Sequence, residues 1–161
     1  MNSVLEIAQL MEFKNWAEKI YVDYIQQLTN EQYHQVILNK SVHQIFYHLY
    51  EVMHHWYSRI AENYTEMLID ESSNREELLT EYYKINQLIN EFVVSGKYTE
   101  FTLQWWDDDK PVNSNSTYVL FNFVTHSAYH RGQLALLLRQ LGFDEIKETD
   151  FNPWIYEIGQ N

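Results

Sequence analysis

The sequence predicts an all-α fold: a bundle of four long helices, with a short extended segment between the third and the fourth. Apolar residues recur every three or four positions over four long stretches, which is the period of a helix that packs on one side. Only four Gly and two Pro occur, so few positions interrupt these stretches. The 161 residues, 16% of them aromatic, suffice for one core, which predicts a single domain over residues 1–161.

The first helix is predicted over residues 3–28, where apolar side chains recur among scattered charges and neither Gly nor Pro occurs. Residues 29–40 break this period and are predicted to form a connection. The second helix should begin after Ser41, because Ser41 and Gln44 have the spacing of a capping box. It is expected to run to about residue 63.

The third helix can be capped by Ser73 or Asn74 and is expected to end at Gly96. Residues 97–106 then change to an alternating apolar pattern, which predicts a short extended segment or hairpin arm. The three aspartates at 107–109 are interpreted as a solvated turn, because they lack the glycine spacing of a calcium-binding EF-hand loop.

The fourth helix is predicted to start at an N-cap within residues 113–116 and to end at Gly142. Gly132 interrupts it, and an interior glycine costs about 1 kcal/mol relative to alanine. The close approach of a neighbouring helix is the expected reason for this glycine. The tail, residues 143–161, is expected to fold back over the bundle.

Two histidines occupy the apolar stripe of this fourth helix. His126 and His130 are spaced i and i+4, so their rings lie one above the other and can bind one metal ion. The alternative is a pair of core histidines that form hydrogen bonds with neighbouring side chains. A buried neutral imidazole needs a partner for each nitrogen, and a shared metal ion would serve both rings. The stripe comprises Val119, Phe123, His126, His130, Leu134, Leu137 and Leu141.

A third ligand has to come from another helix. His48 is the best candidate, because it lies on the inward stripe of the second helix with apolar residues one turn away on either side. His55, seven residues later on the same face, is the next candidate. His34, His43 and His54 are interpreted as solvated surface histidines.

Composition excludes several classes of function. The net charge is -12 and no run of Lys or Arg occurs, which argues against binding to nucleic acid or an anionic membrane. The absence of cysteine excludes disulfides, cysteine-ligated zinc and a cysteine nucleophile. Neither a signal peptide nor a run of 18 apolar residues is apparent, so a cytoplasmic protein is expected.

Three segments resemble one known family. The segment THSAYHRGQLALLLRQLG at 125–142 is similar to the fourth-helix signature of the DinB (damage-inducible) proteins: two histidines, then Arg-Gly-Gln, ending in Leu-Gly. HLYEVMHHWYSRI at 48–60 is similar to the family's second-helix histidine with a tryptophan eight residues on, and MEFKNWAEKI at 11–20 also agrees. The resemblance covers nearly the whole chain, in order.

The resemblance implies that His48, His126 and His130 are the three metal ligands and that His55 is a bystander. It further implies an up-down-down-up bundle, commonly paired as a homodimer. Family members with a known activity are typically transferases or isomerases that use a low-molecular-weight thiol such as bacillithiol or mycothiol. Thr125 departs from the family, where Asn is common, and residues 107–110 lack the usual Gly. These departures leave the substrate open.

Three imidazoles leave coordination positions free for water or substrate, as in catalytic metal sites. Of the metals that suit imidazole, zinc and nickel are expected. The favoured hypothesis is a thiol-dependent transferase or isomerase that acts on a small electrophilic molecule, with the metal lowering the pKa of the thiol.

Other hypotheses stay open. One is a metal-dependent hydrolase, with Glu51 as the nearby carboxylate. A second is a metal used for stability or sensing, and a third is an interaction module without metal. Tyr129, Arg131 and Gln133 flank the ligands, and each either orients ligand or substrate or only packs.

Overall fold

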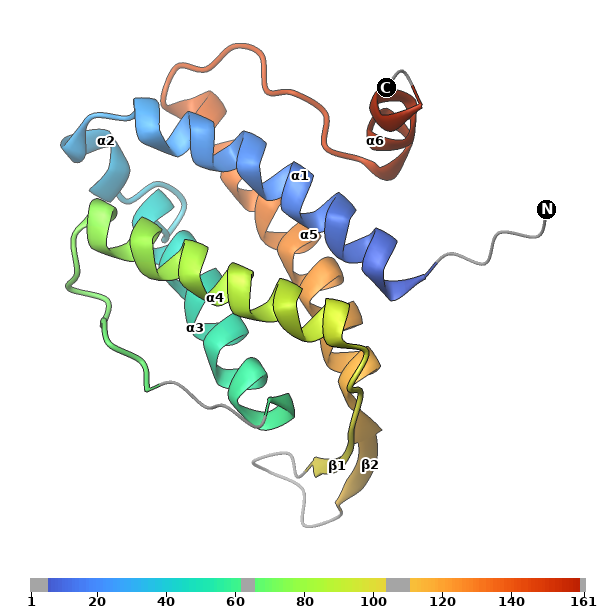
Figure 1. Cartoon of the computed structure of the whole chain (residues 1–161). Helices are drawn as coiled ribbons and strands as arrows, with labels where there is room; N and C mark the ends of the chain where they lie inside the picture. Colours follow the sequence, from blue (N-terminus) through green and yellow to red (C-terminus); the bar gives the residue numbers. More distant parts are fainter. Residues whose placement is uncertain (1–5, 62–65, 104–110, 160–161) are drawn as a thin grey trace.

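The computed structural model describes residues 6–61, 66–103 and 111–159, which are mostly helical (Figure 1). The predicted all-α class is therefore confirmed. The turn predicted at residues 107–109 lies outside the described residues. Among the described helices, none is long and apolar enough to cross a membrane. The long helices are α1 (Ile7–Gln27), α3 (Val42–Ile60), α4 (Arg75–Ser95) and α5 (Ser116–Gln140).

Shorter elements connect and cover these helices. A five-residue helix forms within the predicted connection, and a hairpin joins α4 to α5 where the extended segment was expected (Figure 1). Its strands are antiparallel, with Glu100 opposite Asn115 and Leu103 opposite Val112. The short elements are α2 (Asn30–His34), β1 (Glu100–Leu103), β2 (Val112–Asn115) and α6 (Phe151–Ile158).

The predicted helix ends are explained by local capping. Ser41 and Gln44 form the expected capping box of α3, with both hydrogen bonds at 3.1 Å. Asn74 caps α4, and Gly96 ends it with a φ of 64°, a conformation that glycine adopts at no steric cost. Asn115 caps α5 by accepting a hydrogen bond from the backbone N–H of Tyr118.

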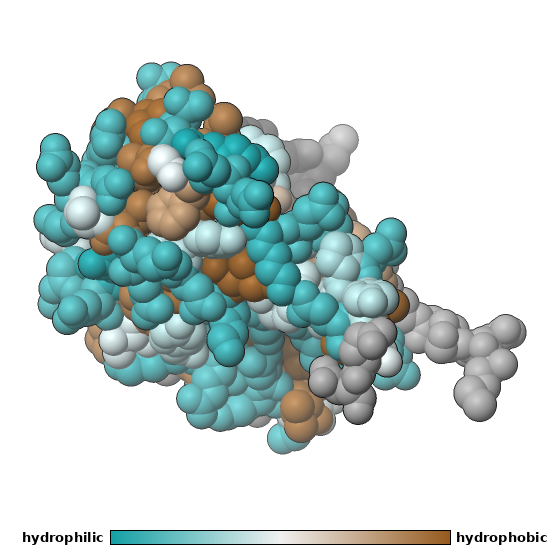
Figure 2. Space-filling view, turned by 90° about the horizontal axis from the view of Figure 1, so that it is seen from above, coloured by the Kyte–Doolittle hydropathy of each residue, from teal (hydrophilic) through white to brown (hydrophobic). Residues whose placement is uncertain are grey.

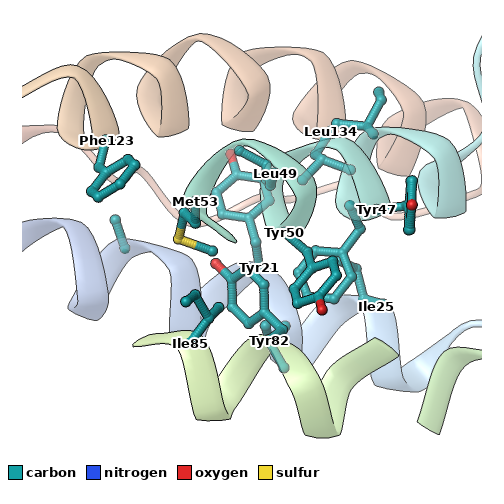
Figure 3. Close-up of a cluster of buried hydrophobic side chains, with 14 of the residues drawn as sticks. Tyr21, Ile25, Tyr47, Leu49, Tyr50, Met53, Tyr82, Ile85, Phe123 and Leu134 are labelled. Carbon is teal, nitrogen blue, oxygen red and sulfur yellow. The ribbon is translucent and has the colours of Figure 1, made fainter. Parts of the chain in front are cut away.

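The core lies between the four long helices. Each of them contacts two others: α5 packs against α1 and α3, and α4 packs against the same two helices. Figure 3 shows the centre of this core, where Tyr21 of α1, Tyr50 and Met53 of α3 and Tyr82 of α4 gather with aliphatic side chains. The helix α3 also contacts α2, so it is covered on more than one side.

A buried ion pair within α1 forms hydrogen bonds with two side chains of α4. Lys14 is fully buried, and its ammonium group donates to the Glu18 carboxylate at 2.7 Å and to the Asn86 amide oxygen at 2.8 Å. The Tyr82 hydroxyl donates to the same carboxylate oxygen of Glu18. Burial lowers the pKa of Lys14, while the Glu18 carboxylate acts in the opposite direction. Burial raises the pKa of Tyr82 well above its usual value.

The tail packs against α1, as expected from the sequence. Phe13 makes ring contacts with Phe151 and Trp154 of α6, and Trp154 is buried. The Trp16 indole N–H donates to Glu157 at 2.9 Å. Seen from above, the surface is mostly hydrophilic with smaller hydrophobic patches (Figure 2), which agrees with the strongly acidic composition.

The structure does not show the close helix approach that was expected at Gly132. A Cβ added at this position would meet nothing within 4 Å, so the predicted close approach of a neighbouring helix is wrong. The tail leaves a small cavity of about 230 Å³ beside this part of α5, lined among others by Gly132, Arg131 and Arg139. The monomer therefore gives no steric reason for glycine here.

Candidate metal centre

The site forms where α3 lies against α5. On α5, His126 and His130 follow each other by one turn, and their ring centroids are 4.4 Å apart. The His48 ring of α3 lies across from them, with its centroid 5.2 Å from that of His126 and 5.0 Å from that of His130. The structure thus brings together the three histidines singled out in the sequence.

The donor set fits a metal ion. One ring nitrogen from each of the three histidines lies within 4.8 Å of the other two. The Nε2 atoms of His126 and His130 are 3.1 Å apart, close to the roughly 3.3 Å between two nitrogens that share a tetrahedral zinc ion. His48, His126 and His130 therefore form a group that can hold a metal ion.

Hydrogen-bond acceptors lie next to two of the three histidine rings. The Nδ1 of His130 lies 2.7 Å from the amide oxygen of Gln133, and the Nδ1 of His48 lies 3.4 Å from a carboxylate oxygen of Glu51. With the ring proton on Nδ1, each imidazole keeps a lone pair on Nε2 for a metal. Gln133, one of three flanking residues noted in the sequence, therefore orients His130.

The site keeps its α5 rings neutral. Burial, followed by the neighbouring rings of His130 and His48, lowers the pKa of His126 to about 4. Burial also lowers the pKa of His130. At neutral pH both rings are therefore unprotonated on one nitrogen, which is the form that binds a metal.

The group borders an open cleft. His130 is buried, His126 is partly buried, and the His48 side chain is 45% exposed. His48 and His126 line a cleft of about 700 Å³ between α3 and the start of α5. This volume falls within the range of small-molecule sites. The other described residues lining it are Glu51, Val52, His55, Trp56, Ser114, Tyr118, Val119 and Asn122.

The remaining histidines separate into two groups. His55, the alternative third ligand, lines the cleft but is not in the three-histidine group. His34 is exposed, as expected. His43 and His54 were predicted on the surface, and this was wrong, because both are buried. The His43 ring lies 3.2 Å from the Tyr33 hydroxyl and 2.7 Å from the Glu71 carbonyl oxygen, so its polar atoms are satisfied inside the protein.

The other two residues noted beside the ligands have different roles. Arg131 is buried, donates to the Ser127 hydroxyl at 2.8 Å and points toward Thr149, so it joins α5 to the tail. Tyr129 is 65% exposed, with its ring centroid 5.0 Å from that of His130.

The cleft residues that were not singled out from the sequence as site residues include Trp56, Tyr118 and Asn122. Trp56 and Tyr118 had a usable signal. Each stands eight residues from a ligand on its own helix, Trp56 after His48 and Tyr118 before His126. Eight residues are a little over two helical turns, so each side chain lies near the face of its ligand.

By fold and site, the chain is a helical protein with a three-histidine group beside a cleft that could hold a metal ion. The model of the DinB family matches residues 1–155. No curated protein and no solved structure matches the chain. The match covers almost the entire sequence, so the chain belongs to the DinB family.

Proposed function

We propose that this protein is a metal-dependent enzyme that uses a low-molecular-weight thiol to transform a small electrophilic molecule, by transfer or isomerisation. The observation that supports this most is the three-histidine group, whose His48 and His126 line a cleft of small-molecule size. A structural metal site is normally closed by four protein ligands, whereas three ligands next to a cleft leave room for a substrate.

His48, His126 and His130 would hold the ion. Imidazole suits zinc, nickel, iron and copper, and of these we propose zinc or nickel. A bound metal supplies Lewis acidity, which lowers the pKa of a thiol or water that binds to it. The protein's own contribution is to keep the α5 rings unprotonated by burial and to orient His130 and His48 through Gln133 and Glu51.

The thiol has to come from outside, because the chain contains no cysteine. In the transfer reaction its sulfur forms a bond to the electrophilic carbon, while the leaving group departs with the bonding electron pair. The thiol proton passes to the leaving group or to solvent. The cleft would place the two reactants side by side, which lowers the entropic cost of their encounter.

Hydrolysis is a second candidate, favoured by one observation. Glu51 lines the cleft next to His48 and brings a carboxylate within reach of a substrate. However, the same carboxylate is 3.4 Å from the Nδ1 of His48, where it acts as that ring's acceptor. We therefore rank thiol transfer first. Parallel assays of one electrophilic ester, with and without added thiol, separate the two reactions.

We also infer that α1, α3, α4 and α5 form the up-down-down-up bundle expected of this family, since each packs against two of the others. We further propose that the protein forms a homodimer and is located in the cytoplasm. Size-exclusion chromatography with light scattering tests the dimer.

The first experiment is elemental analysis of the purified, untagged protein beside three variants. The parent and His55→Ala should hold about one equivalent of metal, whereas His126→Ala and His48→Ala should hold almost none. His55→Ala is the matched control, because His55 lines the cleft outside the three-histidine group. A parent that binds no metal after incubation with zinc and nickel would overturn the proposal.

Chelation then separates a catalytic metal from a structural one. Removing the ion from an open catalytic site should lower the melting temperature by only a few degrees, because the hydrophobic core is built from residues other than the three histidines. Loss of the folded state on chelation would instead favour the non-catalytic role. Thiol-dependent turnover should disappear on chelation and return with added metal.

A further inference from the structure

The walls of the cleft are more apolar and more aromatic than its histidine end. Val52 and Trp56 of α3 face Tyr118 and Val119 of α5 across it, so both helices present apolar and aromatic side chains. Tyr118 is 64% exposed although it is a large aromatic residue. An exposed aromatic at the edge of a cleft can cover the ring of a bound molecule, with a gain in buried apolar surface.

Trp56 is held in place by its neighbours. The guanidinium carbon of Arg59 lies 5.4 Å from the centroid of the Trp56 ring, a cation–π distance. The His55 ring lies edge-on to the same indole, at 5.4 Å between centroids. An indole fixed in this way loses little conformational entropy when a ligand binds against it.

The charges of the side chains that line the cleft indicate which ligands fit it. Glu51 is the only formally charged side chain among the described residues that line the cleft. Neither Lys nor Arg is part of that described lining. A carboxylate on the body of a ligand would be repelled by Glu51, and the nearby guanidinium group of Arg59 lies against the Trp56 ring and is not part of the described lining. The histidine end, in contrast, suits a polar or anionic head that binds a metal.

We propose that the electrophilic substrate is an uncharged small molecule with an aromatic or branched apolar body, which packs against Trp56 and Tyr118 while its reactive polar end lies at His48 and His126. This inference rests on the proposed function and specifies its substrate class. Asn122 and Ser114, two neutral polar residues of the described lining, can form hydrogen bonds with one or two polar substituents of such a body.

Hydroxamates test this without turnover. The protein is loaded with cobalt(II), whose visible spectrum reports ligand binding, and titrated with acetohydroxamate, benzohydroxamate and 4-carboxybenzohydroxamate. All three share the metal-binding head and differ in the body. Benzohydroxamate should bind about 30-fold more tightly than acetohydroxamate, the factor expected for burying one phenyl ring. The 4-carboxy compound should lose most of that gain.

Substitutions in the cleft test where the phenyl ring of benzohydroxamate binds. Trp56→Ala should reduce the benzohydroxamate preference to about 5-fold or less and leave acetohydroxamate affinity unchanged. Tyr118→Ala should act in the same direction, and its side chain is exposed enough that folding is not at risk. Tyr156→Ala is the control, because Tyr156 is an exposed aromatic on α6 that does not line the cleft.

The outcomes distinguish this inference from the proposed function. Equal affinity for the aceto and benzo compounds, or a preference that survives in both Trp56→Ala and Tyr118→Ala, overturns the substrate class while leaving the metal site standing. Tighter binding of the 4-carboxy compound overturns it as well. Absence of any cobalt signal overturns the metal site and the inference together.

Discussion

Replacing Gln133 by alanine tests how the protein prepares its metal ligands. The Gln133 amide oxygen lies 2.7 Å from the Nδ1 of the buried His130 ring, whose Nε2 faces the other ligands. In Gln133→Ala the ring loses the acceptor that holds its proton on Nδ1. The imidazole can then rotate, or carry its proton on the nitrogen that should bind the metal.

The size of the effect follows from this geometry. A neutral hydrogen bond contributes about 0.5–1.5 kcal/mol net, and here it also fixes ring orientation and tautomer. Partners of ligating histidines are typically worth 10–100-fold in metal affinity, or about 1.4–2.7 kcal/mol. His130 is well buried, so water replaces the lost acceptor poorly. We therefore expect zinc affinity to fall about 10–100-fold.

Competition against a chromophoric chelator measures this affinity. Gln140→Ala is the matched control, because it removes the same side chain from an exposed position on the same helix. Gln133→Glu keeps an acceptor and should bind zinc at least as well as the parent. If Gln133→Ala binds zinc within about twofold of the parent, Gln133 does not orient His130 and the reasoning fails.

Three further predictions concern stability. Glu18→Ala should lower the unfolding free energy by about 3–5 kcal/mol in urea titrations, because it leaves the Lys14 ammonium group buried without its anion; a loss below about 1 kcal/mol would contradict the ion pair. Ser41→Ala should cost about 1 kcal/mol by removing the cap of α3, and an unchanged urea midpoint would count against that cap. Burial and neighbouring rings lower the pKa of His126 to about 4, below the roughly 6.5 of an unfolded histidine, so the folded state binds fewer protons and stability falls as pH drops from 6.5 toward 4. Discounted for partial exposure, we expect the metal-free protein to lose about 1 kcal/mol more than His126→Asn between pH 7 and pH 5, and equal losses would refute the assignment.

The sequence was most informative where local rules decide the structure. The capping box at Ser41 and the helix caps at Asn74 and Gly96 depend only on residues within a few positions of each other. The ends of these helices can therefore be predicted from the local sequence. The spacing of His126 and His130 likewise places both rings on one face of a helix, whatever surrounds them.

Placement that depends on tertiary packing was harder to predict. His43 and His54 were assigned to the surface because they lie off the main apolar stripe, yet α3 contacts α2, α4 and α5 and is buried on more than one face. From the sequence, His48 could be ranked above His55 as the third histidine of the group, but the choice could not be decided, since the contact between α3 and α5 is long-range. Gly132 was given a packing reason that the structure does not contain.

The two ligand-bearing helices are separated along the chain by all of α4 and the β-hairpin. An ion bound by His48 together with His126 and His130 would therefore cross-link distant segments, much as a disulfide closes a long loop. Separation of α3 from α5 would break the metal–nitrogen bonds to His48 or those to His126 and His130. For a labile ion, which leaves faster than the helices close again, exchange with solvent would then follow the opening rate of this helix pair and would report on the kinetics of local unfolding.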